Sequence, residues 1–128
     1  MSDYDRRITK KYENPTQTTP TKTETEKYFE FAEKTMTEML EISKRKNADY
    51  TGGGGDPFAN FTRVEAMGIC TTEQGFLTRM TDKMCRISSF VQNGTLEVKD
   101  ESVQDTLKDL ANYSILMLGY LEAKRDKR

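Results

Sequence analysis

The chain has 128 residues, of which 34% are hydrophobic and 32% are charged, and this length suits a single domain. Its 20 basic and 21 acidic residues leave a net charge of −1, so no overall basic field points to nucleic acid. No apolar run approaches the roughly 20 residues needed to cross a membrane, and the N-terminus lacks the apolar stretch of a secretion signal. We therefore expect a cytoplasmic protein.

Histidine is absent and the only cysteines are Cys70 and Cys85. An ordinary structural zinc site cannot be built from this set alone, and Ser-His or Cys-His nucleophile pairs are excluded. We expect both cysteines to be free thiols in a reducing compartment. Any proton transfer would use carboxylates, lysine, tyrosine or water.

Residues 1–22 are polar and contain prolines and many threonines, so we expect a disordered arm there and a folded domain at 23–128. From about Thr23 to Lys46, apolar residues recur at helical spacing, and Thr23 or Thr25 is placed to cap the start. The predicted stripe of this helix comprises Phe29, Ala32, Met36, Met39, Leu40 and Ser43.

Residues 46–61 are expected to break this helix, because a run of four glycines cannot hold a helix together and Asp56-Pro57 is a turn signal. Phe58 and Phe61 are expected to fold back on the core. No Gly-Lys-Ser or Gly-Lys-Thr follows the glycines, so the run is not a Walker-type phosphate loop.

Three further helices are predicted at 61–68, 72–92 and 101–124, and Asn93-Gly94 is a stop signal for the second of them. The 72–92 stripe comprises Phe76, Leu77, Met80, Met84, Ile87 and Val91. The 101–124 stripe comprises Val103, Leu107, Leu110, Ala111, Leu118 and Leu121. The sequence thus predicts an all-α protein, a bundle of about four helices. Its low apolar content favours a core shared with further copies, so we expect a homo-oligomer.

Acidic side chains share one face of the last predicted helix. Glu101, Asp105, Asp109 and Asn112 follow one another at spacings of four, four and three. Two or three oxygen ligands at this spacing could hold Mg²⁺. The alternative is an ordinary solvated acidic face. Apolar residues continue around the helix further on, which favours a cleft or a partner for these acids.

The preceding helix carries Arg79, Asp82, Lys83 and Arg86 on and beside one face. If the two helices pack as a hairpin, these cations lie near the acids. Arginine forks and a carboxylate-held metal together suit a phosphate. A salt-bridge network to Asp105 or Asp109 explains the same pattern equally well.

A third group is Lys46, Asn47, Asp49 and Tyr50, where the first helix is predicted to end. Asp49 and Tyr50, at the entry to the glycine loop, could contact a ligand base by hydrogen bonding and stacking. An ordinary helix C-terminus is the alternative, and spacing alone favours it.

Four blocks of the sequence resemble the nucleotide modification associated domain type 1 family. In order, they are KNADY followed by glycines, DPFANF, RMTDKMCRI and ESVQDTLKDLANY, and the likeness spans roughly residues 40–121. Members of that family are small helical proteins common in phages and prophages. The resemblance implies a phage-type protein of the host cytosol that makes or handles modified nucleotides.

The last two predicted helices are also similar to the MazG-like all-helical nucleotide pyrophosphohydrolases, in which two pairs of acids hold Mg²⁺. Asp109, with Asp105 before it, stands where the second acidic pair would be. The place of the first pair is taken by Asp82-Lys83-x-x-Arg86. The likeness implies a metal site made by Asp82, Asp105 and Asp109.

Together these features predict a protein that binds a nucleoside phosphate. Phosphates would meet Arg79, Lys83 and Arg86, and a Mg²⁺ ion would lie on the three aspartates. The remaining substrate-binding candidates are Lys46, Asn47, Asp49, Tyr50 and Asn112.

If the protein is an enzyme, metal-assisted attack of water on a phosphoanhydride would release pyrophosphate, with Asp105 or Asp109 orienting the water or the metal. Two alternatives stay open. One is a non-catalytic nucleotide sponge or accessory subunit, and the other is a structural helical oligomer.

Overall fold

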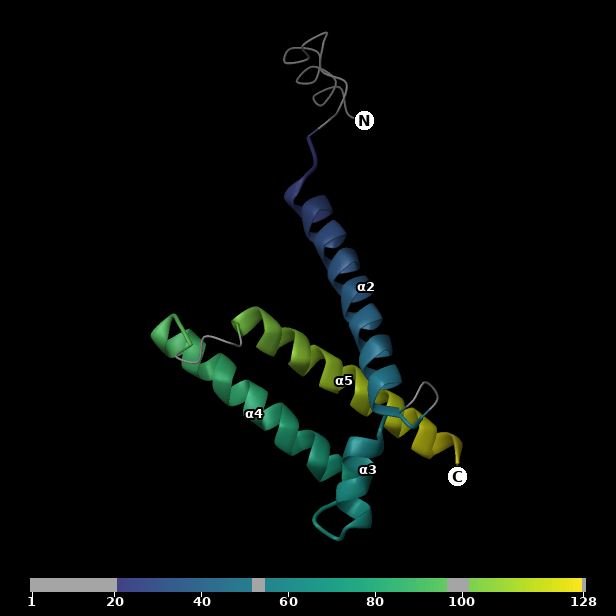
Figure 1. The fold of residues 1–128 in the computed structure, drawn as a ribbon. Coiled ribbons are helices and arrows are strands. Elements are labelled where there is room, and N and C mark those ends of the chain that lie inside the picture. The colour runs from purple at the N-terminus through teal and green to yellow at the C-terminus, as the bar shows by residue number, and fades with distance from the viewer. Residues whose placement is uncertain (1–20, 52–54, 97–101, 128) are drawn as a thin grey trace, which may run out of the picture. The chain divides into compact units, whose positions relative to one another are not determined.

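A computed structural model of the chain describes residues 21–51, 55–96 and 102–127, without the side chains of residues 50 and 51 (Figure 1). These residues form four helices and no strand: α2 (Glu24–Thr51), α3 (Ala59–Ala66), α4 (Thr72–Asn93) and α5 (Val103–Asp126). The predicted all-α fold of about four helices is confirmed. The predicted arm lies almost wholly at 1–20, outside the described residues. The chain divides into two compact units, Met1–Met36 and Thr37–Arg128, so the boundary falls inside α2.

Thr23 caps the start of α2. The Glu26 backbone N–H donates to Thr23 Oγ1 at 3.1 Å, and the Glu26 carboxylate accepts from the Thr23 backbone N–H at 3.2 Å. This reciprocal capping box satisfies two backbone donors that the first turn of a helix leaves unpaired. Of the two threonines proposed from the sequence, the structure selects Thr23.

The prediction that α2 ends near Lys46 was wrong. The helix continues to Thr51, so Lys46, Asn47 and Asp49 lie on helical backbone instead of at a helix end or in a loop. The physical reason is that Asn, Ala, Asp and Tyr cost at most about 0.7 kcal/mol each in a helix, whereas glycine costs about 1 kcal/mol. The backbone ladder therefore carries on until the glycine run begins.

The core of the second unit is a set of aromatic rings from α3, α4 and α5. Phe61 and Phe76 are 6% and 0% exposed, and their rings stack with centroids 3.9 Å apart. Tyr113 meets the edge of Phe61 at 6.0 Å, and Phe58 meets Tyr120 at 5.9 Å. Phe58 also lies over Gly119, where a Cβ would stand 3.4 Å from its ring. The expectation that Phe58 and Phe61 fold back on the core is confirmed.

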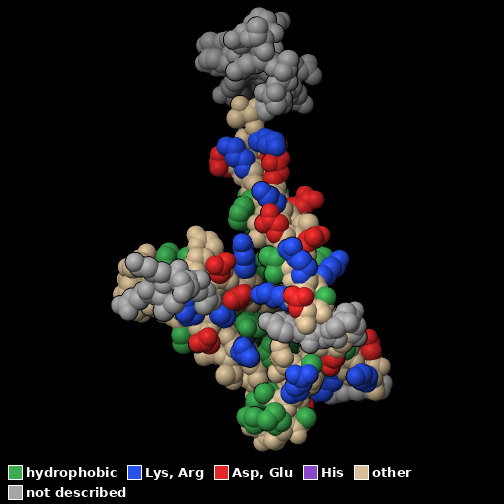
Figure 2. Space-filling view, viewed as in Figure 1, with side chains coloured by type: hydrophobic (Ala, Val, Ile, Leu, Met, Phe, Trp, Pro, Cys, Tyr) green, Lys and Arg blue, Asp and Glu red, His purple; other side chains and the backbone are tan. Residues whose placement is uncertain are grey.

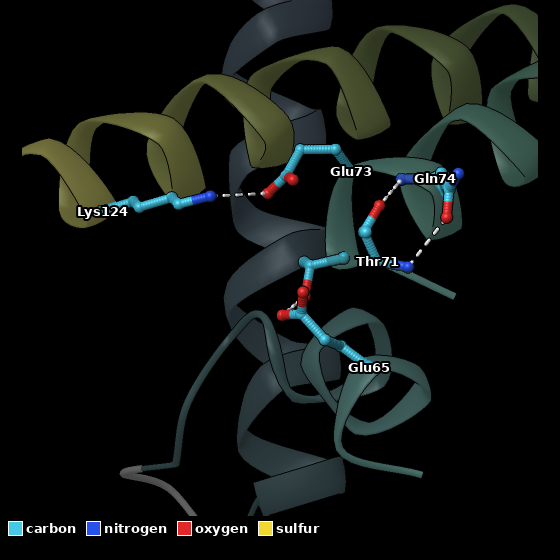
Figure 3. A network of polar contacts seen from close by, with 6 residues as sticks. Glu65, Thr71, Glu73, Gln74 and Lys124 are labelled. Atoms are coloured by element: carbon cyan, nitrogen blue, oxygen red, sulfur yellow. Dashed lines mark hydrogen bonds and ion pairs between the residues drawn. The ribbon is translucent and has the colours of Figure 1, made fainter. Parts of the chain in front are cut away.

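Polar contacts fix the start of α4 against α3 and α5 (Figure 3). Thr71 and Gln74 form a capping box, with bonds of 3.1 and 2.9 Å. Next to it, the buried Thr72 hydroxyl donates to the Glu65 carboxylate at 3.0 Å. Lys124 reaches Glu73 from α5 at 3.4 Å. The Thr72–Glu65 bond joins the N-terminal end of α4 to α3, and the Lys124–Glu73 contact joins it to the C-terminal end of α5.

The end of α4 follows the sequence signal. Gly94 lies in the left-handed region at φ 74°, and its N–H donates to the Phe90 carbonyl at 2.7 Å. Only glycine, and to a lesser degree asparagine, adopts this conformation readily. The predicted stop at Asn93-Gly94 is therefore confirmed.

The predicted apolar stripes of α4 and α5 are only partly right. Phe76 is buried as expected, but several stripe residues do not line the core and are exposed. These are Leu77, Met84 and Val91 on α4, and Leu107, Leu118 and Leu121 on α5. Leu110 lies inward as predicted, but the other residues of the inward row of α5 are Thr106, Tyr113, Met117 and Tyr120. Both rows have spacings of four and three, so periodicity alone could not select between them.

Candidate functional site

A lysine and an aspartate pair directly across the antiparallel α4–α5 hairpin. Lys83 Nζ lies 3.1 Å from Asp109 Oδ2, and the two side chains are 14% and 38% exposed. A lysine is rarely so enclosed unless it has a partner. Asp109 is the more exposed member of the pair, so solvent reaches the pair on the side of its carboxylate.

One helical turn away, a second contact runs parallel to the first. Arg86 Nε donates to Thr106 Oγ1 at 3.4 Å. Thr106 is fully buried, and its hydroxyl in turn donates to the Ser102 carbonyl at 3.1 Å. Because this hydroxyl is tied at both ends, Thr106 holds the arginine stem close to α5.

A third contact joins the second half of α2 to α5. The Ser43 hydroxyl donates to Asn112 Oδ1 at 3.0 Å, and both residues are partly buried. Asn112 lies three residues after Asp109, so the two side chains leave neighbouring positions on one side of α5. Asn112 is thus the part of the predicted α5 constellation that faces α2.

Of the predicted site residues, the structure pairs Lys83 with Asp109. Arg86 and Asn112 contact Thr106 and Ser43, respectively. Arg79, Asp82 and Asp105 are exposed. The backbone N–H of Asp105 donates to Ser102 Oγ at 3.1 Å, so Asp105 occupies the first turn of α5, where a carboxylate favours the helix dipole.

The predicted group on α2 is spread along a helix. Lys46 and Asp49 are exposed, and Asn47 is partly buried. The side chain of Tyr50 and the whole of Glu101 lie outside the described residues. The loop placement predicted for this group is therefore corrected, and its contact with a ligand stays a prediction.

Among the described residues, the side chains predicted to bind Mg²⁺ do not form a cluster. Within residues 21–51, 55–96 and 102–127, no group of three or more Asp, Glu or Cys side chains lies close enough to hold a metal ion. Asp82, Asp105 and Asp109 are all in these ranges, and Asp109 is engaged with Lys83 instead. Mg²⁺ needs several oxygen ligands in near-octahedral geometry. Within the described ranges these aspartates therefore do not form the predicted cluster, and Mg²⁺ binding stays a prediction.

Two members of this site, Thr106 and Ser43, were not predicted from the sequence. Thr106 stands in the inward row that continues through Leu110 and Tyr113, and a hydroxyl within such a row must find a partner. Ser43 stands in the predicted stripe of α2. A polar residue in an otherwise apolar stripe was the available signal in both cases.

Positive and negative side chains alternate over the surface that Figure 2 shows, with no area of a single sign. In the part of the chain that the structure describes, no helix is long and apolar enough to cross a membrane. Cys70 and Cys85 are free, as expected.

The sequence of the hairpin has a counterpart among known families. Residues 61–121 match the family Nucleotide modification associated domain 1. The match runs from α3 through all of α4 to near the end of α5, so it includes Lys83, Arg86, Asp109 and Asn112. Comparison with curated proteins and with solved structures gave no match.

Proposed function

We propose that this protein binds a nucleoside phosphate at the α4–α5 hairpin and takes part in the handling of modified nucleotides. The observation that carries the proposal is the pairing of Lys83 with Asp109 inside the segment that matches a nucleotide-modification family. The family description suggests a nucleotide as the ligand, and the cations of α4 are the groups that would bind its phosphates.

Three cations follow one another along α4. Arg79, Lys83 and Arg86 stand at spacings of four and three, so they form a row roughly 10 Å long on one side of the helix. Arginine grips phosphate oxygens with a fork of donors, and lysine acts as a point charge. A phosphate approaching from the solvent side would compete with Asp109 for Lys83. Binding then exchanges one ion pair for another and leaves no buried charge alone.

Asn112 and Ser43 supply the neutral part of the proposed site. An amide and a hydroxyl can each donate and accept, which suits the sugar or base of a nucleotide. Asn112 lies beyond Asp109 along α5, and Asn47 and Asp49 follow its partner Ser43 on α2. The bound molecule would thus extend from the α4 cations towards α2.

The proposed function is nucleotide binding, with turnover decided by experiment. The full-length protein is titrated calorimetrically with a nucleoside and its mono-, di- and triphosphates, with and without Mg²⁺. We expect affinity to rise with the number of phosphates. Lys83→Met should weaken the triphosphate at least tenfold and leave the nucleoside unchanged, whereas Lys44→Met, an exposed control on α2, should change neither. Absence of binding by the unmodified protein would overturn the proposal.

Pyrophosphate release in the same mixtures separates a hydrolase from a sponge or an accessory subunit. If pyrophosphate release requires an added divalent ion, we infer that the ion binds together with the nucleotide, because the described acidic side chains do not form a cluster. Binding without release would place the protein among non-catalytic nucleotide binders.

A structural role is the second candidate, and the 3.1 Å Lys83–Asp109 distance favours it because the pair already joins two helices. In that case Lys83→Met would lower the melting temperature, and no nucleotide would raise the melting temperature of the unmodified protein.

A further inference from the structure

The α4–α5 hairpin carries a second apolar row on each helix, next to the row that faces the core. On α4, the inward row consists of positions 76, 80, 83, 87 and 90. The positions one residue later form an outward row, which contains Leu77, Met84 and Val91. On α5, the inward positions 106, 110, 113, 117 and 120 are followed by Leu107, Leu118 and Leu121. These six outward side chains are between 43% and 74% exposed. Neither helix has thus buried all of its apolar surface.

Both outward rows lie on the same side of the hairpin. One residue along an α-helix is a turn of about 100°. Because α4 and α5 run antiparallel with their inward rows facing each other, an equal right-handed turn on each carries both outward rows to one side. The opposite side of α5 holds Asn112 against Ser43 and Gly119 against Phe58. We call the side with the six exposed residues the bare face.

The α4 half of the bare face carries no charge, whereas Lys108, Glu122 and Arg125 lie on or beside the row of its α5 half. The exposed neighbours of its α4 row are Thr78, Thr81, Cys85, Ser88 and Gln92, none of them charged. This contrasts with a chain in which 32% of residues are charged. Solvated helix faces carry charged side chains, whereas the centres of interfaces are depleted in them. The composition of the α4 half is therefore that of an interface.

The size of the bare face also suits an interface. Each outward row spans fifteen residues, a rise of about 20 Å, and two helices of about 10 Å diameter make the face about 20 Å wide. The projected area is thus about 400 Å² before the relief of the side chains is counted. Apolar patches of a few hundred Å² on a monomer often mark interaction sites, and this projected area is about half of the roughly 800 Å² that each partner contributes to an interface of standard size.

We infer that a second copy of this chain covers the bare face, with α5 antiparallel to its counterpart around Ser114. The α5 row is self-complementary about that point: Leu107 would face Leu121 of the other copy, and Ala111 would face Leu118. Small Ala111 and Ser114 side chains allow close approach at the centre. The charges at the edge match as well, because Lys108 would lie beside Glu122 of the other copy and the reverse. Such isologous pairing is the rule in two-fold dimers.

The first test measures the mass of the full chain by sedimentation velocity over a hundredfold range of concentration. We expect a dimer that dissociates on dilution. Leu118→Glu should weaken the dimer at least tenfold, while Leu40→Glu, an equally drastic change at an exposed leucine of α2, should leave it intact. A monomer at every concentration would overturn the inference, and would indicate that residues of the same chain cover the face. Equal weakening by both variants would overturn it too.

The second test does not depend on a variant with a damaged apolar face. Lys108→Glu should weaken the dimer by like-charge repulsion, and adding Glu122→Lys should restore it. In a chain with Cys70→Ser and Cys85→Ser, the single thiol of Ser114→Cys should form a disulfide between copies under mild oxidation. A dimer that shows neither the rescue nor the cross-link would overturn the antiparallel arrangement.

Discussion

Lys83 on α4 and Asp109 on α5 form an ion pair of 3.1 Å in which the lysine is far more enclosed than the aspartate. The pair joins the two helices that the family match covers most fully. Its uneven exposure gives the two partners different roles. The ammonium of Lys83 is largely removed from solvent, whereas the carboxylate of Asp109 is more accessible to solvent.

Removing the charge of Asp109 should therefore lower stability as well as any activity. Asp109→Asn removes the carboxylate that forms an ion pair with the enclosed Lys83. The expected cost lies between the roughly 0–1 kcal/mol of an exposed pair and the 3–5 kcal/mol of a buried one, at about 1–2 kcal/mol. Urea unfolding followed by circular dichroism measures it. The double variant Lys83→Met/Asp109→Leu should recover most of the loss, and a double variant as weak as the sum of the single ones would contradict this account.

The stacked rings of Phe61 and Phe76 should dominate the stability of the second unit. Phe76→Ala removes a side chain with no exposed surface, at an expected cost of about 3–5 kcal/mol. Phe29→Ala serves as a matched control, because Phe29 on α2 is exposed, and it should cost less than about 0.5 kcal/mol. The free energy of unfolding from urea titration decides between them. Similar losses for the two would show that the aromatic stack is not the core.

The capping box at Thr71 should be measurable through the melting temperature. Thr71→Ala removes the acceptor of the Gln74 N–H and should cost about 1 kcal/mol. For a domain of this size that is a fall of roughly 4–8 °C. Thr71→Ser keeps the oxygen and should remain within about 2 °C of the unmodified protein. If the serine variant melts as low as the alanine variant, the methyl group of threonine matters and the hydrogen bond does not.

Gly94 should tolerate asparagine better than alanine. Its φ of 74° is strained for a side chain, although a Cβ there would meet no neighbouring atom within 4 Å. The cost of alanine is therefore conformational, about 1 kcal/mol. Gly94→Asn should cost less, since asparagine is enriched in the left-handed region. Thermal unfolding of the two variants compares them directly, and the reverse order would assign the effect to something other than backbone strain.

The sequence by itself determined which segments are helical and several of their ends. Helical spacing of apolar residues, threonine caps and Asn93-Gly94 are local signals, and they depend on a few neighbouring residues only. For the same reason the end of α2 was placed too early. The mild helix propensities of residues 47–50 do not decide whether a helix stops at residue 46 or at residue 51.

Only the tertiary structure decided which row of each helix turns inward. On α5, Thr106 and Leu107 begin two rows of identical spacing, and the packing of Phe61 and Phe76 against Tyr113 and Tyr120 selects the first. That choice pairs Lys83 with Asp109 and leaves Leu107 and Leu118 uncovered. A one-residue step rotates every side chain of a helix by about 100°, and no local signal fixes that rotation, because its energy comes from contacts between residues far apart in the chain.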